Sequence, residues 1–183
     1  MVSRPHREQG ALLIDLGGGT TDYVLYHQGG IAASGCLGVG GDHLTNDISH
    51  PKCLNLPLQI AEGLKTKHGS VYFDTRKGGK QIDLESGNGF AGGAVDENML
   101  NQVIHLRVKE IFEIVRRELE PTGYLDQLGA GIFLSGGSSL LDGVGDLAQA
   151  VFGTPVQTAA GNAGSGTRAA LENPQYATAM GLI

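Results

Sequence analysis

A short acidic and glycine-rich segment near the start of the sequence has the residue types and spacing to bind a phosphate. Its members are Asp15, Gly17, Gly18, Gly19, Thr20 and Thr21. Glycines in a tight turn expose backbone N–H groups that form an anion-binding nest, and the Thr20 hydroxyl adds a donor. Asp15 would hold Mg²⁺ through water, as carboxylates do where the metal also bridges phosphates. The alternative is an ordinary glycine hairpin, which the flanking acidic and threonine residues disfavour.

A second glycine pair stands more than a hundred residues further along the chain. An apolar run over residues 132–134 leads through Ser135 into Gly136 and Gly137, and Ser138 follows. A strand that ends in paired glycines and continues into a serine-capped helix lets a flat ligand lie against bare backbone. A plain strand-to-helix turn is the alternative. Residues 135–138 also resemble an ABC-transporter signature, but the sequence has no Walker A motif, which excludes that class.

Glu62 and Lys65 are a third candidate, on a helix predicted to follow Pro57. Residues three apart on a helix share a face. A carboxylate there can accept hydrogen bonds from ribose hydroxyls, and the lysine stem can cover a purine. The alternative is a solvated surface pair. Asp42 is expected first of all to cap a helix, with a ribose contact as its other interpretation.

Composition narrows the classes of function. The chain has 183 residues, of which 30 are glycine. Its net charge is −6, and this negative charge does not favour binding to a nucleic acid. Two cysteines fit a reducing compartment, and with His43 and His50 they match no common zinc spacing. Neither a signal peptide nor an apolar stretch of about 20 residues is present, so we expect a cytoplasmic protein.

The elements that must position these residues follow from hydrophobic periodicity and glycine or proline breaks. Strands are predicted at 11–16, 22–27 and 31–37 as an antiparallel meander, and at 70–75, 81–85, 129–134 and 155–158. Helices are predicted at 42–50, 57–69, 96–121 and 140–152, with a last helix or turn at 174–182 after a flexible loop at 159–168. The long helix has an apolar stripe expected to pack in the core. This order indicates a mixed α/β domain with an insertion near residues 42–97.

Two candidate nucleotide motifs separated by a helical insertion resemble the arrangement of the actin-like ATPase superfamily. Residues 15–22 look like its second phosphate motif, and residues 134–140 look like its adenosine motif. Within the superfamily the sequence is most similar to the FtsA family of bacterial cell-division actin homologues. Residues 40–48, 61–65 and 173–182 carry that similarity.

The resemblance implies an actin-like (ribonuclease H-like) fold, with a mixed five-stranded sheet, flanking helices and a small α+β insertion. Residues 1–41 and 98–183 would form the nucleotide-binding subdomain, and 42–97 the inserted one. The implied ligands are ATP and Mg²⁺. Phosphates would lie on the turn at 17–20, the metal on Asp15, and adenosine between the glycines at 136–137 and the pair Glu62 and Lys65.

The resemblance also implies a cellular role. The parent protein would polymerise, bind a tubulin-like division protein and tether division filaments at the inner face of the cell membrane. We expect this chain to be the second lobe alone, without the first-half phosphate loop or the membrane-binding amphipathic helix, and therefore without hydrolytic activity of its own.

Three alternatives from the same superfamily stay open at this point. A PilM-like pilus-assembly adaptor would have a similar fold but would work by capturing a partner's peptide. A chaperone-type ATPase, such as a reactivating factor, is the second. A sugar or acyl kinase is the third, and it requires a catalytic carboxylate that the sequence does not offer.

Overall fold

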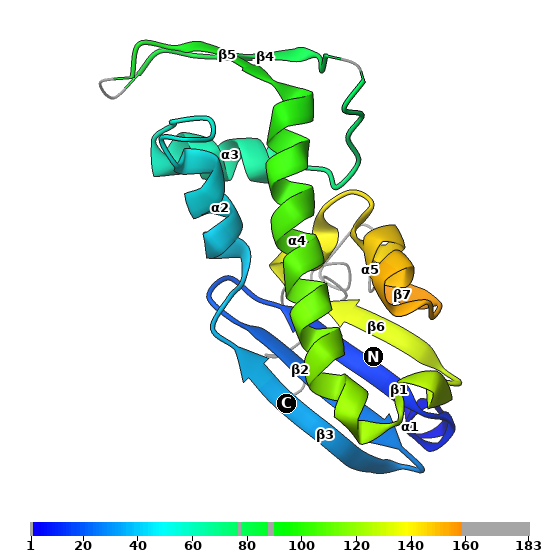
Figure 1. The fold of residues 1–183 in the computed structure, drawn as a ribbon. Helices are drawn as coiled ribbons and strands as arrows, with labels where there is room; N and C mark the ends of the chain where they lie inside the picture. The colour runs from blue at the N-terminus through cyan, green and yellow to red at the C-terminus, as the bar shows by residue number, and fades with distance from the viewer. Residues whose placement is uncertain (1, 77, 88–89, 159–183) are drawn as a thin grey trace, which may run out of the picture. The chain divides into compact units, whose positions relative to one another are not determined.

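The computed structural model describes residues 2–76, 78–87 and 90–158 (Figure 1). The described residues fall into two compact units. The first unit contains residues 2–41, 109–140 and 144–158, and the second contains residues 42–108 and 141–143. The predicted loop at 159–168 and the predicted element at 174–182 lie outside the described residues.

The first unit is built on a five-stranded sheet in the order β3-β2-β1-β6-β7. Its strands are β1 (Ala11–Leu16), β2 (Thr21–His27), β3 (Gly30–Leu37), β6 (Gly131–Ser135) and β7 (Val156–Thr158). The first three form the predicted antiparallel meander, while β6 runs parallel to β1 and β7 parallel to β6. The mixed five-stranded sheet expected from the sequence is therefore confirmed.

Local chemistry explains the hairpin between β2 and β3. Gln28 and Gly29 both have positive φ, 51° and 82°, which is the two-residue turn whose twist matches paired antiparallel strands. The central strands are buried because helices and neighbouring strands cover them. All five residues of β6 are buried, and so are Leu12, Ile14 and Leu16 of β1. This buried pair of strands forms the rigid support on which the glycine turns stand.

Two helical segments of the first unit differ from the sequence prediction. α1 (Arg4–Gln9) was not predicted, because its six residues have no apolar stripe; Ser3 caps it and Pro5 lies in its first turn. The helix predicted at 140–152 begins only at Val144, as α5 (Val144–Phe152), and a 3-10 turn, η3 (Gly137–Leu140), precedes it. Gly143 lies between the two with a positive φ of 78°, which is incompatible with a continuous helix.

The second unit contains α2 (Gly41–Ser49), α3 (Leu58–His68) and a hairpin of β4 (Gln81–Leu84) and β5 (Gly93–Asp96). The strand predicted at 70–75 was wrong. Ser70 makes an isolated bridge to Asp142, and the backbone of this segment bonds instead to side chains of the long helix, as in Asp74 N–H to Asn98 Oδ1 at 2.8 Å. β5 was not predicted, because glycines obscure its pattern.

The long helix α4 (Glu97–Leu119) confirms the prediction for residues 96–121. Asp96 caps it by accepting bonds from the backbone N–H groups of Asn98 and Met99. The predicted core stripe is buried throughout; it consists of Leu100, Ile104, Val108, Ile111, Val115 and Leu119. Across residues 2–76, 78–87 and 90–158, no helix has both the length and the apolar character needed to cross a bilayer.

Candidate functional site

The turn after β1 exposes two of its three glycines, while the carbonyl of the first is hydrogen-bonded within the fold. Gly18 and Gly19 are exposed. The Gly17 carbonyl accepts a bond from Gly41 N–H at 2.9 Å, and in a trans peptide the next N–H points the opposite way. The Gly18 N–H therefore points away from Gly41. A Cβ added at Gly19 would meet nothing within 4 Å, so space for a ligand is open there.

Gly40 packs directly against the backbone of this turn. A Cβ at Gly40 would lie 2.5, 2.6 and 2.9 Å from the carbonyl oxygens of Gly17, Gly18 and Thr20. No side chain fits into such a space, so only a glycine at position 40 lets this segment pack against the turn. The sequence shows that Gly40 and Gly41 are adjacent, but it does not predict this contact.

The two threonines of the turn have different surroundings. Thr20 is exposed, and its hydroxyl donates to Asp22 Oδ2 at 3.0 Å. Thr21 is fully buried, and its hydroxyl donates to the Val39 carbonyl at 2.8 Å. Thr21 thus ties the start of β2 to the segment before Gly40, while Thr20 stands at the surface beside a carboxylate.

The second glycine turn follows β6 and touches the first strand. β1 and β6 are parallel neighbours, with Asp15 in register with Ser135, so both turns leave the same edge of the sheet. Gly136 has φ +86°, and a Cβ there would lie 2.4 Å from Asp15 Oδ1 and from the Leu16 carbonyl oxygen. Gly137 is exposed, and a Cβ there would meet nothing within 4 Å. The structure thus brings together two motifs that are 120 positions apart.

Beyond Gly137, the chain turns tightly. Ser138 is half-buried, and the buried Ser139 donates both its N–H and its hydroxyl to the Gly136 carbonyl, the latter at 2.7 Å. These bonds hold the η3 turn in place, so that Gly137 and Ser138 present backbone at the surface.

The strand register also reveals a row of polar side chains that sequence reasoning missed. Cys36, Asp22, Asp15 and Ser135 occupy directly paired positions on β3, β2, β1 and β6. Paired residues share one face of a sheet, so the two carboxylates are cross-strand neighbours, an unfavourable arrangement without a compensating cation or donor. The hydrogen bond between Cys36 and the Asp22 carboxylate, with smaller effects of burial and charge, raises the pKa of the thiol.

The donor set fits a magnesium ion held mainly by its ligand and water. The described residues hold no group of three His, Cys, Asp or Glu side chains that could enclose a metal. Mg²⁺ is commonly bound by one or two carboxylates plus phosphates and water. Asp15 and Asp22 supply that number of carboxylates at the strand ends, beside the exposed turn.

Glu62 and Lys65 lie together on α3, as the sequence predicted, but they are not a solvated pair. Lys65 Nζ is 2.7 Å from Glu62 Oε2 and donates to Thr45 Oγ1 at 2.9 Å, while the Thr45 hydroxyl donates to Glu62 Oε2. The Lys65 side chain is only 10% exposed and that of Glu62 is 48% exposed. Burial by itself would raise the pKa of Glu62, but the bonds from Lys65 and Thr45 outweigh it and lower that pKa.

A hollow of about 500 Å³ adjoins this cluster within the second unit. It is lined by Asp42, Thr45, Asn46, Leu58, Gln59 and Glu62. Asp42 lies in the first turn of α2, one position inside the helix rather than at the expected cap. The hollow combines apolar wall with the exposed Glu62 carboxylate, which suits a ligand that has a flat apolar part and hydroxyls.

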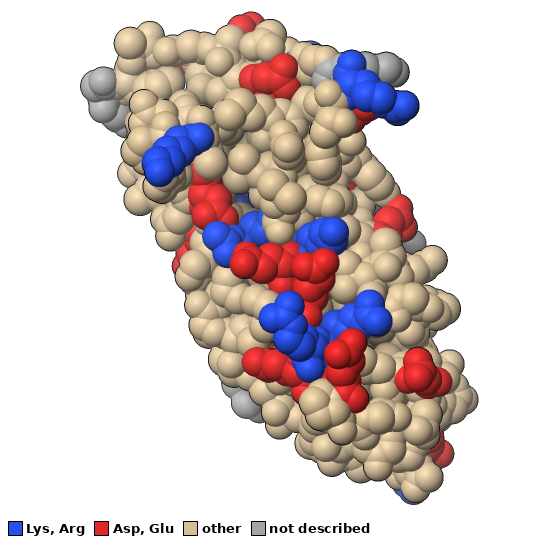
Figure 2. Space-filling model, in the orientation of Figure 1, with Lys and Arg blue, Asp and Glu red and all other residues tan. Residues whose placement is uncertain are grey.

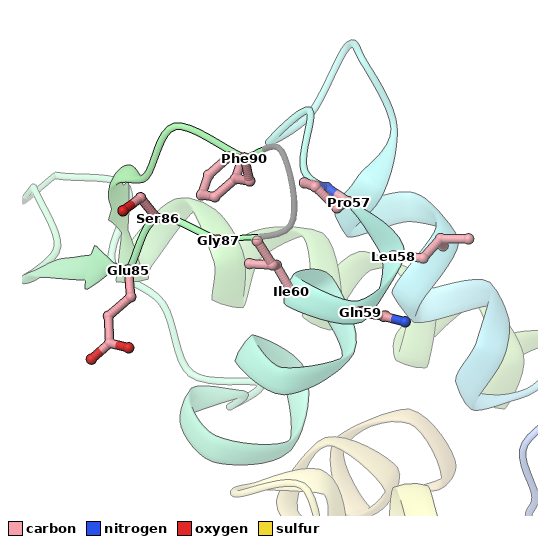
Figure 3. A pocket seen from close by; sticks show the side chains of 8 residues that line it. All are labelled: Pro57, Leu58, Gln59, Ile60, Glu85, Ser86, Gly87 and Phe90. Atoms are coloured by element: carbon pink, nitrogen blue, oxygen red, sulfur yellow. The ribbon is translucent and has the colours of Figure 1, made fainter.

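A neighbouring hollow of about 490 Å³ has a different character (Figure 3). Ile60 and Phe90 face one another across it, and the Glu85 carboxylate points away. Among the described residues that line this hollow, apolar side chains predominate on its facing walls. On the face of the molecule in Figure 2, positive and negative side chains are interspersed, and α4 itself has oppositely charged pairs such as Lys109 with Glu113.

Solved structures identify the class of fold. The structure matches a chain in a PilM–PilN type IV pilus biogenesis complex, with a TM-score of 0.67 and 21% sequence identity. The match covers 98% of this chain and 46% of that one. It also matches MreB5 of Spiroplasma citri bound to ADP, covering 95% of this chain and 55% of that one, at a TM-score of 0.63 and 22% identity. At these identities the likeness concerns fold alone. The fold is actin-like, as the resemblance implied.

Sequence comparison then gives the family. The profile described as "Cell division protein FtsA" matches residues 12–181, so this chain belongs to the FtsA family of cell-division proteins. It is 33% identical over 184 residues to the cell division protein FtsA of Neisseria meningitidis and 32% identical over 183 residues to that of Pseudomonas aeruginosa. All of this chain is covered, against 44% and 43% of those relatives. The chain thus spans less than half of their length.

Proposed function

We propose that this chain is the nucleotide-binding second lobe of an FtsA-type actin homologue and that it binds ATP with Mg²⁺. One observation carries the proposal: the parallel pairing of β1 and β6 sets the Asp15 carboxylate and both glycine turns at one edge of a sheet. Open space at Gly19 and Gly137 supports it, since neither glycine is needed for packing. The actin-like neighbour MreB5 of Spiroplasma citri was solved with AMPPNP and with ADP.

In this proposal each residue has a defined task. The N–H groups of Gly17, Gly18, Gly19 and Thr20 hold phosphate oxygens, and Thr20 exchanges its bond to Asp22 for one to the ligand. Thr21 was also predicted to bind the nucleotide, but it is fully buried and its hydroxyl is occupied by Val39, so it supports the turn without contacting the ligand. Asp15, with Asp22 opposite, holds Mg²⁺, which neutralises phosphate charge when bound.

The nucleoside end of the ligand has its own residues. Backbone at Gly136, Gly137 and Ser138 lies against adenosine, and in the second unit Glu62 accepts bonds from ribose hydroxyls while the Lys65 stem covers the base. We infer that the two compact units correspond to the nucleotide-binding and inserted subdomains of the superfamily. The assigned residues include no general base for a water nucleophile, so we expect binding without hydrolysis by this chain.

The proposed cellular role follows from the family. The whole protein polymerises, binds a tubulin-like division protein and tethers its filaments at the inner membrane face, working in the cytoplasm as a peripheral protein. Self-association is supported by the actin-like neighbour MamK, solved as a double helical filament at a TM-score of 0.60 and 16% identity. A pilus adaptor is less favoured, because PilM matches in fold alone whereas the FtsA profile matches the sequence.

Binding of ATP to the chain in the presence of Mg²⁺ tests the site. Gly137→Val should fold normally, since its side chain enters open space, yet it should block the ligand and lower affinity at least tenfold. Asp15→Ala should abolish the dependence of affinity on Mg²⁺. Gly30→Val is a matched control at the opposite end of β2 and β3, where a Cβ has one ordinary contact, at 3.8 Å from the His27 carbonyl oxygen. Unchanged ATP affinity in both site variants would falsify the assignment.

A further inference from the structure

We propose that Thr45 is a positioning residue for the nucleoside end of the site. Its hydroxyl fixes Glu62 and Lys65 so that one glutamate oxygen is left for the ligand and the lysine ammonium is held by protein. The inference rests on the proposed nucleotide site, and it assigns a task to a residue that the sequence analysis included only within residues 40–48, without a role of its own.

The geometry of the cluster carries the inference. The bonds from Thr45 Oγ1 and Lys65 Nζ both go to the same atom, Glu62 Oε2. A carboxylate oxygen has two lone pairs, so these two donors occupy Oε2. The other oxygen, Oε1, is therefore the one available for a further bond. The side chain is 48% exposed, which leaves Oε1 accessible to a ligand hydroxyl.

The chemistry of a hydroxyl is essential in this arrangement. Thr45 donates one bond to Glu62 and accepts one from Lys65, and only a group that both donates and accepts can link the two. Thr45 is buried, with 7% of its surface exposed, so it acts through its neighbours rather than by reaching solvent. Its place on α2 couples that helix to both site residues on α3.

Fixing these side chains in advance has an energetic consequence. A free glutamate or lysine side chain loses rotamer entropy when a ligand orders it, and a side chain already held loses less. With the hydroxyl absent, Glu62 would have to be ordered by the nucleotide itself. The expected signature is a loss of discrimination for ribose hydroxyls, because only Glu62 is assigned to them.

The first measurement is independent of any nucleotide. We expect the Glu62 pKa, followed by NMR titration of its carboxyl carbon, to rise toward its ordinary value in Thr45→Val and to stay low in Thr45→Ser. Thr66→Val is the matched control on α3, because its hydroxyl donates to the Glu62 backbone carbonyl at 2.9 Å rather than to the carboxylate. An unchanged Glu62 pKa in Thr45→Val would overturn the inference.

The second measurement compares ATP with 2′,3′-dideoxy-ATP by calorimetry, using the chain in the presence of Mg²⁺. Loss of a bond that positions a charged group lowers ATP affinity by roughly three- to tenfold in Thr45→Val, while the dideoxy compound changes little. Thr45→Ser should restore the preference for ribose. An equal loss for both nucleotides would show a merely structural role and overturn the inference.

The outcomes separate the inference from the proposed function. Wild-type chain that binds ATP, with a ribose preference untouched by Thr45→Val, overturns the role of Thr45 alone. Wild-type chain that binds no nucleotide overturns the proposed function and with it this inference. If Thr45→Val loses its circular dichroism melting transition, Thr45→Ala, which removes the hydroxyl without adding a methyl group against its partners, gives the same two readouts.

Discussion

The turns that follow β1 and β6 are both rich in glycine, but the glycines differ in whether the fold leaves room for a Cβ atom. At Gly136 the backbone has a positive φ, and the position of a Cβ is already taken by Asp15 and Leu16. Gly137 and Gly19 have open space instead. A Cβ at Gly17, in the same turn as Gly19, would lie 2.9 Å from the Thr20 carbonyl oxygen. Each turn therefore combines a glycine whose Cβ position is obstructed with one whose Cβ position is open. A glycine that the fold does not require is the better indicator of a ligand.

The largest effect is expected for Gly136→Ala. A positive φ costs an L-residue about 1–2 kcal/mol, and the overlap with Asp15 and Leu16 adds roughly 1–3 kcal/mol. We expect the free energy of unfolding to fall by roughly 3 kcal/mol or more, measured by urea denaturation. Gly137→Ala, one position further on, should change it by less than about 0.5 kcal/mol. Equal losses in the two variants would contradict the distinction between required and free glycines.

A somewhat smaller loss is expected for Gly40→Ala. The added methyl group would overlap three backbone carbonyls, which cannot rotate aside as a flexible side chain does. We expect the free energy of unfolding to fall by roughly 2–3 kcal/mol. We also expect weaker ATP binding, because the turn at residues 17–20 must shift. Gly38→Ala is the matched control, because a Cβ there meets nothing within 4 Å. A variant at Gly40 as stable as that control would show that the turn does not depend on this contact.

Gly35→Ala tests a glycine required by a side chain rather than by backbone. Its Cβ would lie 2.2 Å from the hydroxyl oxygen of Tyr23, which bonds to Glu118. Burial, followed by that bond and the Glu118 charge, raises the pKa of Tyr23 from 10.0 to about 12. A raised pKa stabilises the fold below pH 10, and this contribution is lost as the pH rises through about 12.

We therefore expect wild-type stability to decline between pH 10 and 12 and Gly35→Ala to weaken that dependence, with a loss of roughly 1–3 kcal/mol at neutral pH. Urea denaturation as a function of pH measures the first effect. Tyrosinate absorbance, with Tyr23→Phe as the reference, measures the pKa, which should move down toward 10. A Tyr23 pKa still near 12 in the alanine variant would refute the steric argument.

The smallest structural effect is expected for Gly19→Ala. Its methyl group enters open space, and the residue has no positive φ, so stability should stay within about 0.5 kcal/mol of wild type. The ligand, however, would meet the added carbon, and ATP affinity should fall several-fold by calorimetry. Loss of stability with unchanged affinity would reverse the assignment of Gly19.

Patterns along the chain were sufficient for most elements of the sheet and for α4. Apolar runs ended by glycine predicted β1, β6 and both turns, and the stripe from Leu100 to Leu119 predicted the buried face of α4. Hydrophobic patterns did not predict the short polar segments. The helix α1 has no apolar stripe. Residues 70–75 have the composition of a strand, but their backbone bonds to side chains of a helix.

The site was predictable only in part, for a similar reason. The residue types at Asp15, Gly137 and Glu62 indicate chemistry locally. The support from Gly40 and the link from Thr45 depend on packing between segments separated along the chain, and the pairing of Asp15 with Asp22 depends on the strand register of the hairpin. Spacing along the chain does not contain that information.

The pairing of β1 with β6 also has a consequence for how the chain acquires its site. The meander of β1, β2 and β3 closes through short connections, whereas Asp15 and Ser135 come together only after 120 positions of chain have been closed into a loop. Contacts of such separation form slowly and late. At a synthesis rate of about 5–20 residues per second, the turn after β1 leaves the ribosome roughly 6–24 seconds before β6, the strand that pairs with β1. Until then the central strand β1 has one open edge, so we expect the candidate site to be among the last parts of the first unit to form.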